Sequence, residues 1–321
     1  MAKEKLIVGN HKWPESIDFD QDGNLYFTDA IEKALFQITR NEDGTLASTS
    51  TKLLYGFDHA SGVSIDRENA FLYLGAKVKK AGKIIKIPLR WFETHRDIDY
   101  RSFDRNTLID PALRLEELDI EFRGKRPRAA TPNGVVFHRQ SNTVFYTDSN
   151  IPGSLWGSMG FIGNTNDLNQ PELITPNGID IDPKAENGLV VSLLRRKSVI
   201  RWDFKKKEET SRIRVGSWLD GLLCLEDGNV LVAAFGSRKI FHLSRKDNEF
   251  TNPCVIAELS GYPTDLAIGK SSDGMGESLF VTTIRGITFL WGGGKVLEIP
   301  HIQELIQTKS SIQGGAKHER Q

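Results

Sequence analysis

Short apolar stretches alternate with polar turns along most of the chain, and the same arrangement recurs in six units. Each unit contains two short segments in which apolar and polar residues partly alternate, joined by a turn rich in Asp, Asn and Gly. This pattern is typical of paired β-strands, so we predict an all-β protein built from repeated hairpins. The units are residues 13–30, 60–76, 131–149, 175–193, 219–236 and 263–283.

Three of the turns carry the strongest hairpin signals. They are Asp22-Gly23, Asp227-Gly228 and Asn187-Gly188. Tight two-residue hairpins favour these pairs because their central residues adopt positive φ angles. We therefore expect left-handed backbone at each of the three turns.

One position of the repeat can be followed through all six units. It lies two residues before the leading apolar residue of the first strand, and we call it the column. The separations between its successive members are 46, 72, 44, 43 and 44 residues. A period of about 40–45 residues is typical of four-stranded propeller blades. The column consists of Glu15, Ser61, Asn133, Asn177, Asp220 and Thr264.

The repeat therefore predicts a six-bladed β-propeller with four-stranded blades. Radial repetition of this kind leaves few free strand edges. We expect the N-terminal segment 4–10 to close the ring as the outer strand of the last blade. One domain spanning 1–321 is predicted, because no linker separates the units.

The long separation between the second and third column residues indicates an insertion at about 90–128. This stretch is charged and aromatic, and "LRLEELDIEF" within it is a candidate outer strand. Two interpretations stay open, a surface excursion and a lid over one mouth of the central channel. The C-terminal residues begin with a helical turn or two and end in a polar tail, about 308–321, which we expect to be disordered.

Charge and cysteine content exclude several function classes. The 42 basic and 42 acidic residues balance, so no overall field favours nucleic acid or an anionic membrane. Cys224 and Cys254 alone do not form a disulfide framework, and no Cys- or His-rich metal pattern occurs. The N-terminus lacks an apolar segment of signal-peptide length, and no segment approaches membrane-spanning length. The sequence predicts a cytoplasmic protein.

The chemistry of the column suggests a metal site. The innermost strand of each blade runs along the channel, so column residues surround one mouth. Glu15 and Asp220 supply carboxylates, and Asn133 and Asn177 supply amide oxygens. Such oxygen donors suit Ca²⁺, while the absence of soft ligands argues against zinc or copper. The alternative is a set of ordinary turn residues around an empty mouth. Glycines 134, 178 and 221 would allow a tight backbone turn behind each ligand.

The repeated motifs resemble a known family. "WPESIDFDQDGNLYFTD", "TPNGVVFHRQSNTVFYTDS", "TPNGIDID" and "LDGLLCLEDGNVLVAAFG" are similar to the senescence-marker-protein (regucalcin)/gluconolactonase family, related to paraoxonase and diisopropyl fluorophosphatase. The resemblance covers roughly residues 6–300. It implies a six-bladed propeller whose catalytic divalent cation is held by Glu15, Asn133, Asn177 and Asp220. The implied ion is Ca²⁺, with Mg²⁺, Mn²⁺ or Zn²⁺ as alternatives in its place.

Two positions depart from the family pattern. Gluconolactonases have an Arg two residues before the third-blade Asn, where this chain has Thr131. Paraoxonases have a His at the second-blade column position, where this chain has Ser61, with His59 two residues earlier. A sugar-acid lactone substrate and a paraoxonase-type His relay are therefore both in doubt.

The resulting hypothesis is a metal-dependent hydrolase of a small lactone or ester. A metal ion would polarise the carbonyl, and Asp220 would act as general base or nucleophile, unless it only binds the ion. There are two alternatives. One is a biosynthetic isomerase or cyclase that uses the same pocket, and the other is a non-catalytic calcium-binding or interaction propeller. Candidate substrate-binding residues, each of which could equally be structural or solvated, are Ser61, Thr131, Lys77, Asp148, Arg285 and His59.

Overall fold

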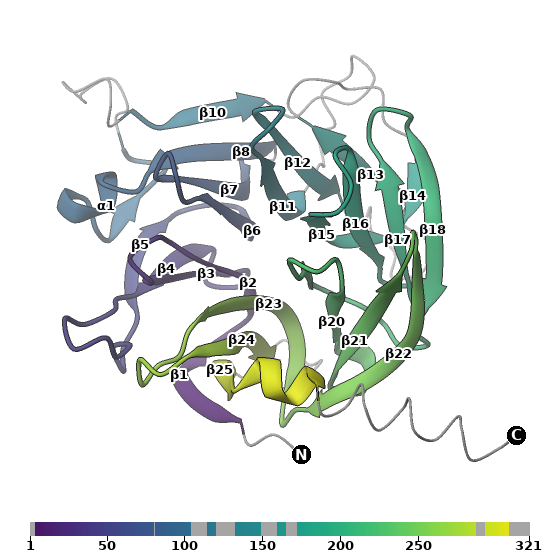
Figure 1. Cartoon of the computed structure of the whole chain (residues 1–321). Coiled ribbons are helices and arrows are strands. Elements are labelled where there is room, and N and C mark those ends of the chain that lie inside the picture. The colour runs from purple at the N-terminus through teal and green to yellow at the C-terminus, as the bar shows by residue number, and fades with distance from the viewer. Residues whose placement is uncertain are drawn as a thin grey trace, which may run out of the picture.

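Six β-sheets surround a common centre in the computed structural model of this chain (Figure 1). The structure describes residues 4–79, 81–103, 114–119, 132–148, 159–164, 172–286 and 293–307. Within these ranges, neighbouring strands of a sheet run antiparallel from the centre outward, except at the outer edge of the first sheet. The fold is therefore the predicted all-β propeller.

The first three sheets follow the first three units of the repeat. The first sheet contains β2 (Pro14–Phe19), β3 (Leu25–Asp29), β4 (Ala34–Ile38), β5 (Thr51–Tyr55) and β9 (Ile98–Asp99). The second contains β6 (His59–Asp66), β7 (Phe71–Val78), β8 (Ala81–Pro88) and β10 (Glu116–Asp119). The third contains β11 (Pro132–His138), β12 (Thr143–Asp148), β13 (Met159–Asn164) and β14 (Glu172–Ile174).

The remaining three sheets complete the ring. The fourth contains β15 (Pro176–Ile181), β16 (Gly188–Leu193), β17 (Ser198–Asp203) and β18 (Glu208–Arg214). The fifth contains β19 (Leu222–Cys224), β20 (Val230–Ala234), β21 (Lys239–Lys246) and β22 (Glu249–Glu258). The sixth contains β23 (Tyr262–Lys270), β24 (Glu277–Ile284), β25 (Gly294–Pro300) and β1 (Lys5–His11).

The N-terminal strand closes the ring as predicted. β1 is the outer strand of the sixth sheet and pairs antiparallel with β25, with Leu6 opposite Leu297. The chain then passes directly from β1 into β2, the innermost strand of the first sheet. The first and last segments of the fold are therefore held together by strand pairing.

The described part of the insertion packs on the outer edges of the first two sheets. β10 is the outer strand of the second sheet, where "LRLEELDIEF" was expected to provide one. β9 pairs in parallel with β5, so the prediction of four strands per blade is wrong for the first sheet. The short helix α1 (Trp91–Thr94) buries Trp91 and Phe92 in the apolar cluster between these sheets. No described residue of the insertion is among those that line the central cavity.

The predicted hairpin turns are confirmed in two of three cases. Gly23 and Gly228 have φ angles of 80° and 87°, in the left-handed region. The prediction is wrong at Asn187-Gly188, where neither residue has a positive φ angle. Gly188 is instead required by space, because a Cβ there would lie 2.7 Å from the Cβ of Ala185.

The core lies between adjacent sheets rather than within one. Phe19 of β2 meets Phe280 of β24 with ring centroids 4.9 Å apart, which joins the first and sixth sheets. Ile302 and Ile306, in a helical segment at 302–307, pack against the cluster of the last two sheets. The predicted tail at 308–321 lies outside the described residues. Among the described helices, none is long and apolar enough to cross a membrane.

Candidate functional site

The column residues lie at irregularities in the pairing of the innermost strands. In the third sheet the register between β11 and β12 shifts between Pro132 and Val135, and Asn133 lies within this shift. The fourth sheet has the same break around Asn177. Such β-bulges turn a side chain out of the alternating pattern of a strand. They direct the column side chains toward the channel mouth. Register breaks also occur beside Glu15, Ser61 and Thr264.

Side-chain hydroxyls on the second strand hold the column backbone in place. Ser192 accepts a hydrogen bond from the N–H of Gly178 (2.8 Å) and donates one to the carbonyl of Asp220 in the next sheet. Each such hydroxyl thereby fixes the positions of two neighbouring column segments. The equivalent groups are Thr28 with Ser16 and Ser61, and Thr147 with Gly134 and Asn177.

The glycines that follow the column are needed for space, not for a left-handed turn. None of Gly134, Gly178 and Gly221 has a positive φ angle, so none of them adopts the left-handed backbone that favours glycine. A Cβ on Gly134 would lie 2.6 Å from the carbonyl oxygen of Asn177. A Cβ on Gly178 would lie 2.7 Å from the Cα of Gly221. Innermost strands of adjacent sheets approach so closely here that only glycine fits.

Glu15, Asn177 and Asp220 converge at one cavity. It has a volume of about 850 Å³ and is also lined by Asn133. Burial raises the pKa of Asp220 well above its usual value, and the negative charge of Glu15 raises it further. The amide of Asn177 donates a hydrogen bond to Asp220, which opposes this increase. The ring predicted from the column therefore brings residues from distant parts of the chain within electrostatic reach.

Glu15 is held by a hydrogen bond from a neighbouring aromatic side chain. Its pKa is raised to about 7 by burial, while a hydrogen bond from the indole N–H of Trp13 lowers it and the charges of Asp265 and Asp29 raise it. The indole of Trp13 therefore orients a carboxylate of the ring.

The two hydroxyl residues of the column link neighbouring sheets. The hydroxyl of Ser61 donates to the carbonyl of Pro132, and that of Thr264 donates to the carbonyl of Pro14 (2.7 Å). Ser61 is fully buried. These hydroxyls thus bind the backbone of the next sheet, and the acid and amide oxygens of the column come from its other four positions, all of which line the cavity.

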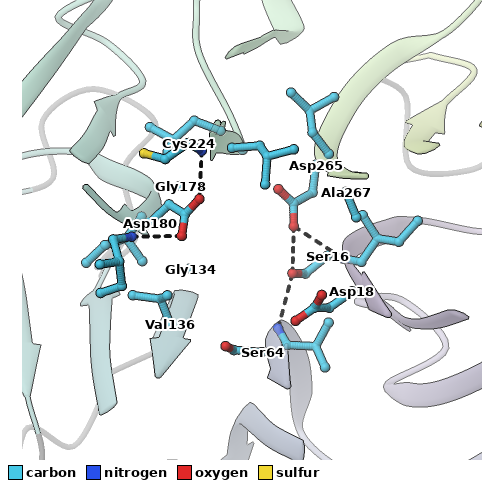
Figure 2. Close-up of a pocket in the computed structure, with 18 of the residues that line it drawn as sticks. Ser16, Asp18, Ser64, Gly134, Val136, Gly178, Asp180, Cys224, Asp265 and Ala267 are labelled. Atoms are coloured by element: carbon cyan, nitrogen blue, oxygen red, sulfur yellow. Dashed lines mark hydrogen bonds between the residues drawn. The ribbon is translucent and has the colours of Figure 1, made fainter. Parts of the chain in front are cut away.

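A second level of carboxylates lies deeper in the channel and was missed by sequence reasoning. Asp180 accepts hydrogen bonds from the N–H groups of Ile181 and Cys224, both at 2.7 Å (Figure 2). Asp265 accepts from the Ser16 hydroxyl at 2.7 Å (Figure 2), and Asp18 from the Ile65 N–H at 2.8 Å. Each carboxylate therefore connects its own sheet to the next one. In the sequence, the signal that could have revealed these carboxylates was a polar residue within each of these innermost strands.

Removal of one of these carboxylates should change how stability depends on pH. The pKa of Asp180 is raised to about 7 because burial outweighs its backbone hydrogen bonds. The unfolded chain loses this proton near pH 4, whereas the folded protein keeps it until about pH 7. The free energy of unfolding should therefore decrease as pH rises through this window, by about 1 kcal/mol per pH unit for this group.

Urea denaturation of chelated protein between pH 4.5 and 7.5 measures this dependence. In the variant Asp180→Asn, the free energy of unfolding should decrease less steeply with pH than in the parent protein. The difference in slope should correspond to the release of about one proton. Asp43→Asn, at an exposed turn, is the matched control and should leave the slope unchanged. An unchanged slope in Asp180→Asn would contradict the assignment.

The candidate substrate-binding residues lie at or beyond the edge of the ring. His59 and Lys77 are opposite each other in β6 and β7, and burial lowers the pKa of His59 to about 4, with Lys77 and Lys33 contributing. Asp148 is fully buried at the end of β12, and Arg285 is exposed. None of these is among the described residues that line the cavity. Thr131 lies outside the described residues.

Aromatic side chains flank the same mouth at the fifth and sixth sheets. Trp218 is two residues before Asp220 and is 47% exposed. Phe235 is part of the short 3₁₀ helix η3 (Phe235–Ser237), and the centroid of its ring lies 5.4 Å from that of Tyr262. These aromatic side chains lie at the same end of the strands as the acidic ring, outside the described residues that line the cavity.

Comparison with known proteins identifies the fold. No protein-family model and no curated protein sequence matches this chain. Among solved structures, a luciferin-regenerating enzyme aligns with a TM-score of 0.67 at 14% identity, covering 93% of this chain and 95% of that one. A gluconolactonase from Xanthomonas campestris aligns with a TM-score of 0.62 at 15% identity, covering 93% and 90%.

A third structure shows how widely this architecture is used. A PQQ-bound aldose sugar dehydrogenase from Streptomyces coelicolor aligns with a TM-score of 0.60 at 11% identity, covering 93% of this chain and 99% of that one. At identities this low, the similarity is evidence for a shared fold alone and does not extend to activity. The chain is thus a β-propeller. More particularly, it has the gluconolactonase-like architecture that its motifs had indicated.

Proposed function

We propose that this protein is a divalent-metal-dependent hydrolase of a small lactone or ester. The observation that carries the proposal is the convergence of Glu15, Asn177 and Asp220 on one cavity, where the charge of Glu15 raises the pKa of Asp220. Two buried carboxylates in electrostatic contact are costly without a compensating cation. The fold similarity to a gluconolactonase supports the same reaction class.

The donor set fits a hard divalent ion. Glu15 and Asp220 would contribute carboxylate oxygens, and Asn133 and Asn177 amide oxygens, which are the ligand types that Ca²⁺ accepts. Mg²⁺, Mn²⁺ or Zn²⁺ are the alternatives. When bound, the ion would supply Lewis acidity toward the carbonyl oxygen of the substrate.

The protein side chains account for the remaining requirements. Asp220, with its raised pKa, is suited to take a proton from an attacking water and pass it to the leaving alcohol. Asn177 keeps that carboxylate oriented by its hydrogen bond. Trp218, exposed beside Asp220, would contact the apolar part of the substrate. Ring opening of a lactone or cleavage of an ester needs no further group.

Calcium binding to chelator-treated protein tests the proposal first. We expect one Ca²⁺ per chain by calorimetric titration. The affinity should fall about 10- to 100-fold in Asn177→Ala, because an amide ligand and the orientation of Asp220 are both lost. Asn41→Ala, at an exposed turn, is the matched control. Hydrolysis of a lactone and ester panel should follow metal occupancy; a metal-bound protein without turnover would favour the non-catalytic propeller.

A further inference from the structure

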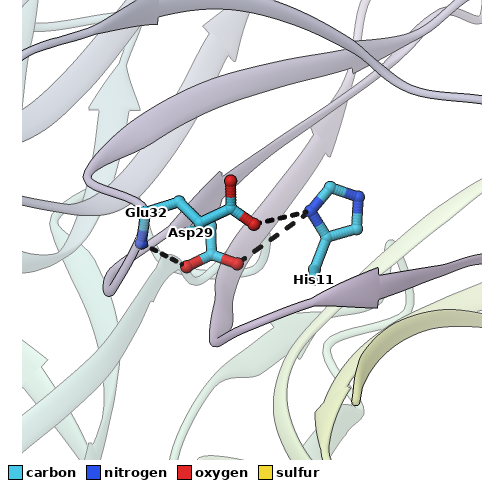
Figure 3. A group of neighbouring side chains, drawn as sticks. All are labelled: His11, Asp29 and Glu32. Carbon is cyan, nitrogen blue, oxygen red and sulfur yellow. Dashed lines mark hydrogen bonds and ion pairs between the residues drawn. The ribbon is translucent and has the colours of Figure 1, made fainter. Parts of the chain in front are cut away.

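A second group of potential ligands lies outside the channel, at the end of β1. His11, Asp29 and Glu32 each offer one donor atom, and these atoms lie within 4.8 Å of one another (Figure 3). The Nδ1 of His11 is 3.9 Å from Asp29 Oδ2 and 3.8 Å from Glu32 Oε1. Both distances are too long for a hydrogen bond. Two atoms bound to one ion at about 2.0–2.2 Å each can be about 4 Å apart.

The orientation of His11 is the independent sign of a missing partner. The residue is only 6% exposed, and its Nδ1 is buried with no hydrogen-bond partner among the described residues. Figure 3 shows this nitrogen directed at the two carboxylates. A buried ring nitrogen without a partner is costly, so its direction toward two anionic groups indicates that a cation fills the gap.

The surroundings fix the imidazole in a form suited to metal binding. Its other nitrogen, Nε2, lies 3.1 Å from the hydroxyl of Ser50, and the ring packs against Phe27 and Phe36 with centroids 4.7 Å away from each. Metal-binding histidines commonly use their second nitrogen in such a bond.

Of the two carboxylates, that of Asp29 is held firmly by hydrogen bonds. Asp29 accepts backbone N–H bonds on both oxygens, from Lys12 and Trp13 on Oδ2 and from Ile31 and Glu32 on Oδ1. Glu32 is less buried, with 21% of its side chain exposed.

Lys52 forms an ion pair with one of these carboxylates. Its ammonium group lies 4.0 Å from the other oxygen of Glu32, Oε2. Oε1 of Glu32 therefore still faces His11.

We propose that His11, Asp29 and Glu32 bind one divalent transition-metal ion, Zn²⁺ or a similar ion, which ties the last sheet of the propeller to the first. One nitrogen and two oxygen donors suit ions of intermediate softness better than Ca²⁺, which prefers six to eight oxygens. His11 belongs to the outer strand of the sixth sheet, whereas Asp29 and Glu32 belong to the first. The ion would cross-link the sixth and first sheets at the point where the ring closes.

Zinc binding in the presence of saturating Ca²⁺ tests this site separately from the channel. We expect one Zn²⁺ per chain by equilibrium dialysis. Affinity should fall about 100-fold in Glu32→Gln and in His11→Gln. It should be unaffected by Asn177→Ala in the channel or by the control Glu42→Gln at an exposed turn. Equal Zn²⁺ binding by parent and Glu32→Gln protein, or no Zn²⁺ binding by the parent, would overturn the proposal.

Stability supplies the second readout and tests the structural role. Zn²⁺ at a hundredfold excess over its dissociation constant should raise the melting temperature by about 5 °C. Amide hydrogen exchange in β1 should slow at least about tenfold. Both effects should disappear in Glu32→Gln, which retains the four backbone hydrogen bonds of Asp29. If zinc bound at these residues without slowing amide exchange in β1, the proposed structural role of the ion would be wrong.

Discussion

Asp220→Asn is expected to lower hydrolysis by about a thousandfold while calcium binding weakens only modestly. The amide has nearly the same shape as the carboxylate and keeps one oxygen for an ion. It cannot accept a proton from water, however, and loss of a general base typically costs 10²- to 10⁴-fold, roughly. The measurement is kcat at a calcium concentration that saturates the variant, together with its calcium affinity by titration.

This design separates two roles that the structure allows for Asp220. Suppose that saturating calcium restores most of the activity of Asp220→Asn. Then Asp220 acts only as a ligand, and the base must be another group. A persistent deficit in the fully loaded variant supports direct participation in the reaction. Asp43→Asn, the same change at an exposed turn, should leave both kcat and affinity unchanged.

The sequence was sufficient to predict the propeller and the position of its ring. A β-bulge recurs at the same point of successive blades, so a fixed separation of about 44 residues directs Asn133 and Asn177 to one mouth. The column could therefore be found without coordinates. The extra strand β9 could not, because its two residues, Ile98 and Asp99, carry no strand pattern and pair only through tertiary packing.

Features that depend on contacts between sheets could also not be predicted from the sequence. Asp180 resembles any polar residue of a strand, and its role follows from the backbone N–H of Cys224, 44 residues away in the chain. Glu32 and His11 likewise meet only because β1, a strand of the last sheet, ends beside the turn between β3 and β4 of the first. The repeat gives the direction of each side chain within its own blade, and the neighbouring blade decides what that side chain meets.

Gly178→Ala should destabilise the protein by about 3 kcal/mol and weaken calcium binding at the same time. The added Cβ would lie 2.7 Å from the Cα of Gly221 and 2.8 Å from the carbonyl oxygen of Asp220. Both are backbone atoms, so relief requires the fourth and fifth sheets to move apart, and overpacking of this kind costs a few kcal/mol, roughly 1–3. The same movement would displace the segment that carries Asp220. Urea denaturation and calcium titration measure the two effects.

Gly9→Ala is the matched control, because it makes the same change in a strand with room for it. There the added Cβ would meet only the side chains of Leu6 at 3.8 Å and Lys295 at 4.0 Å, and the φ angle is not positive. Stability should be unchanged or should increase by about 0.5 kcal/mol through the reduced freedom of the unfolded chain. If Gly178→Ala were as stable as Gly9→Ala, the close approach of the innermost strands, and with it the geometry that brings Asp220 to Asn177, would be wrong.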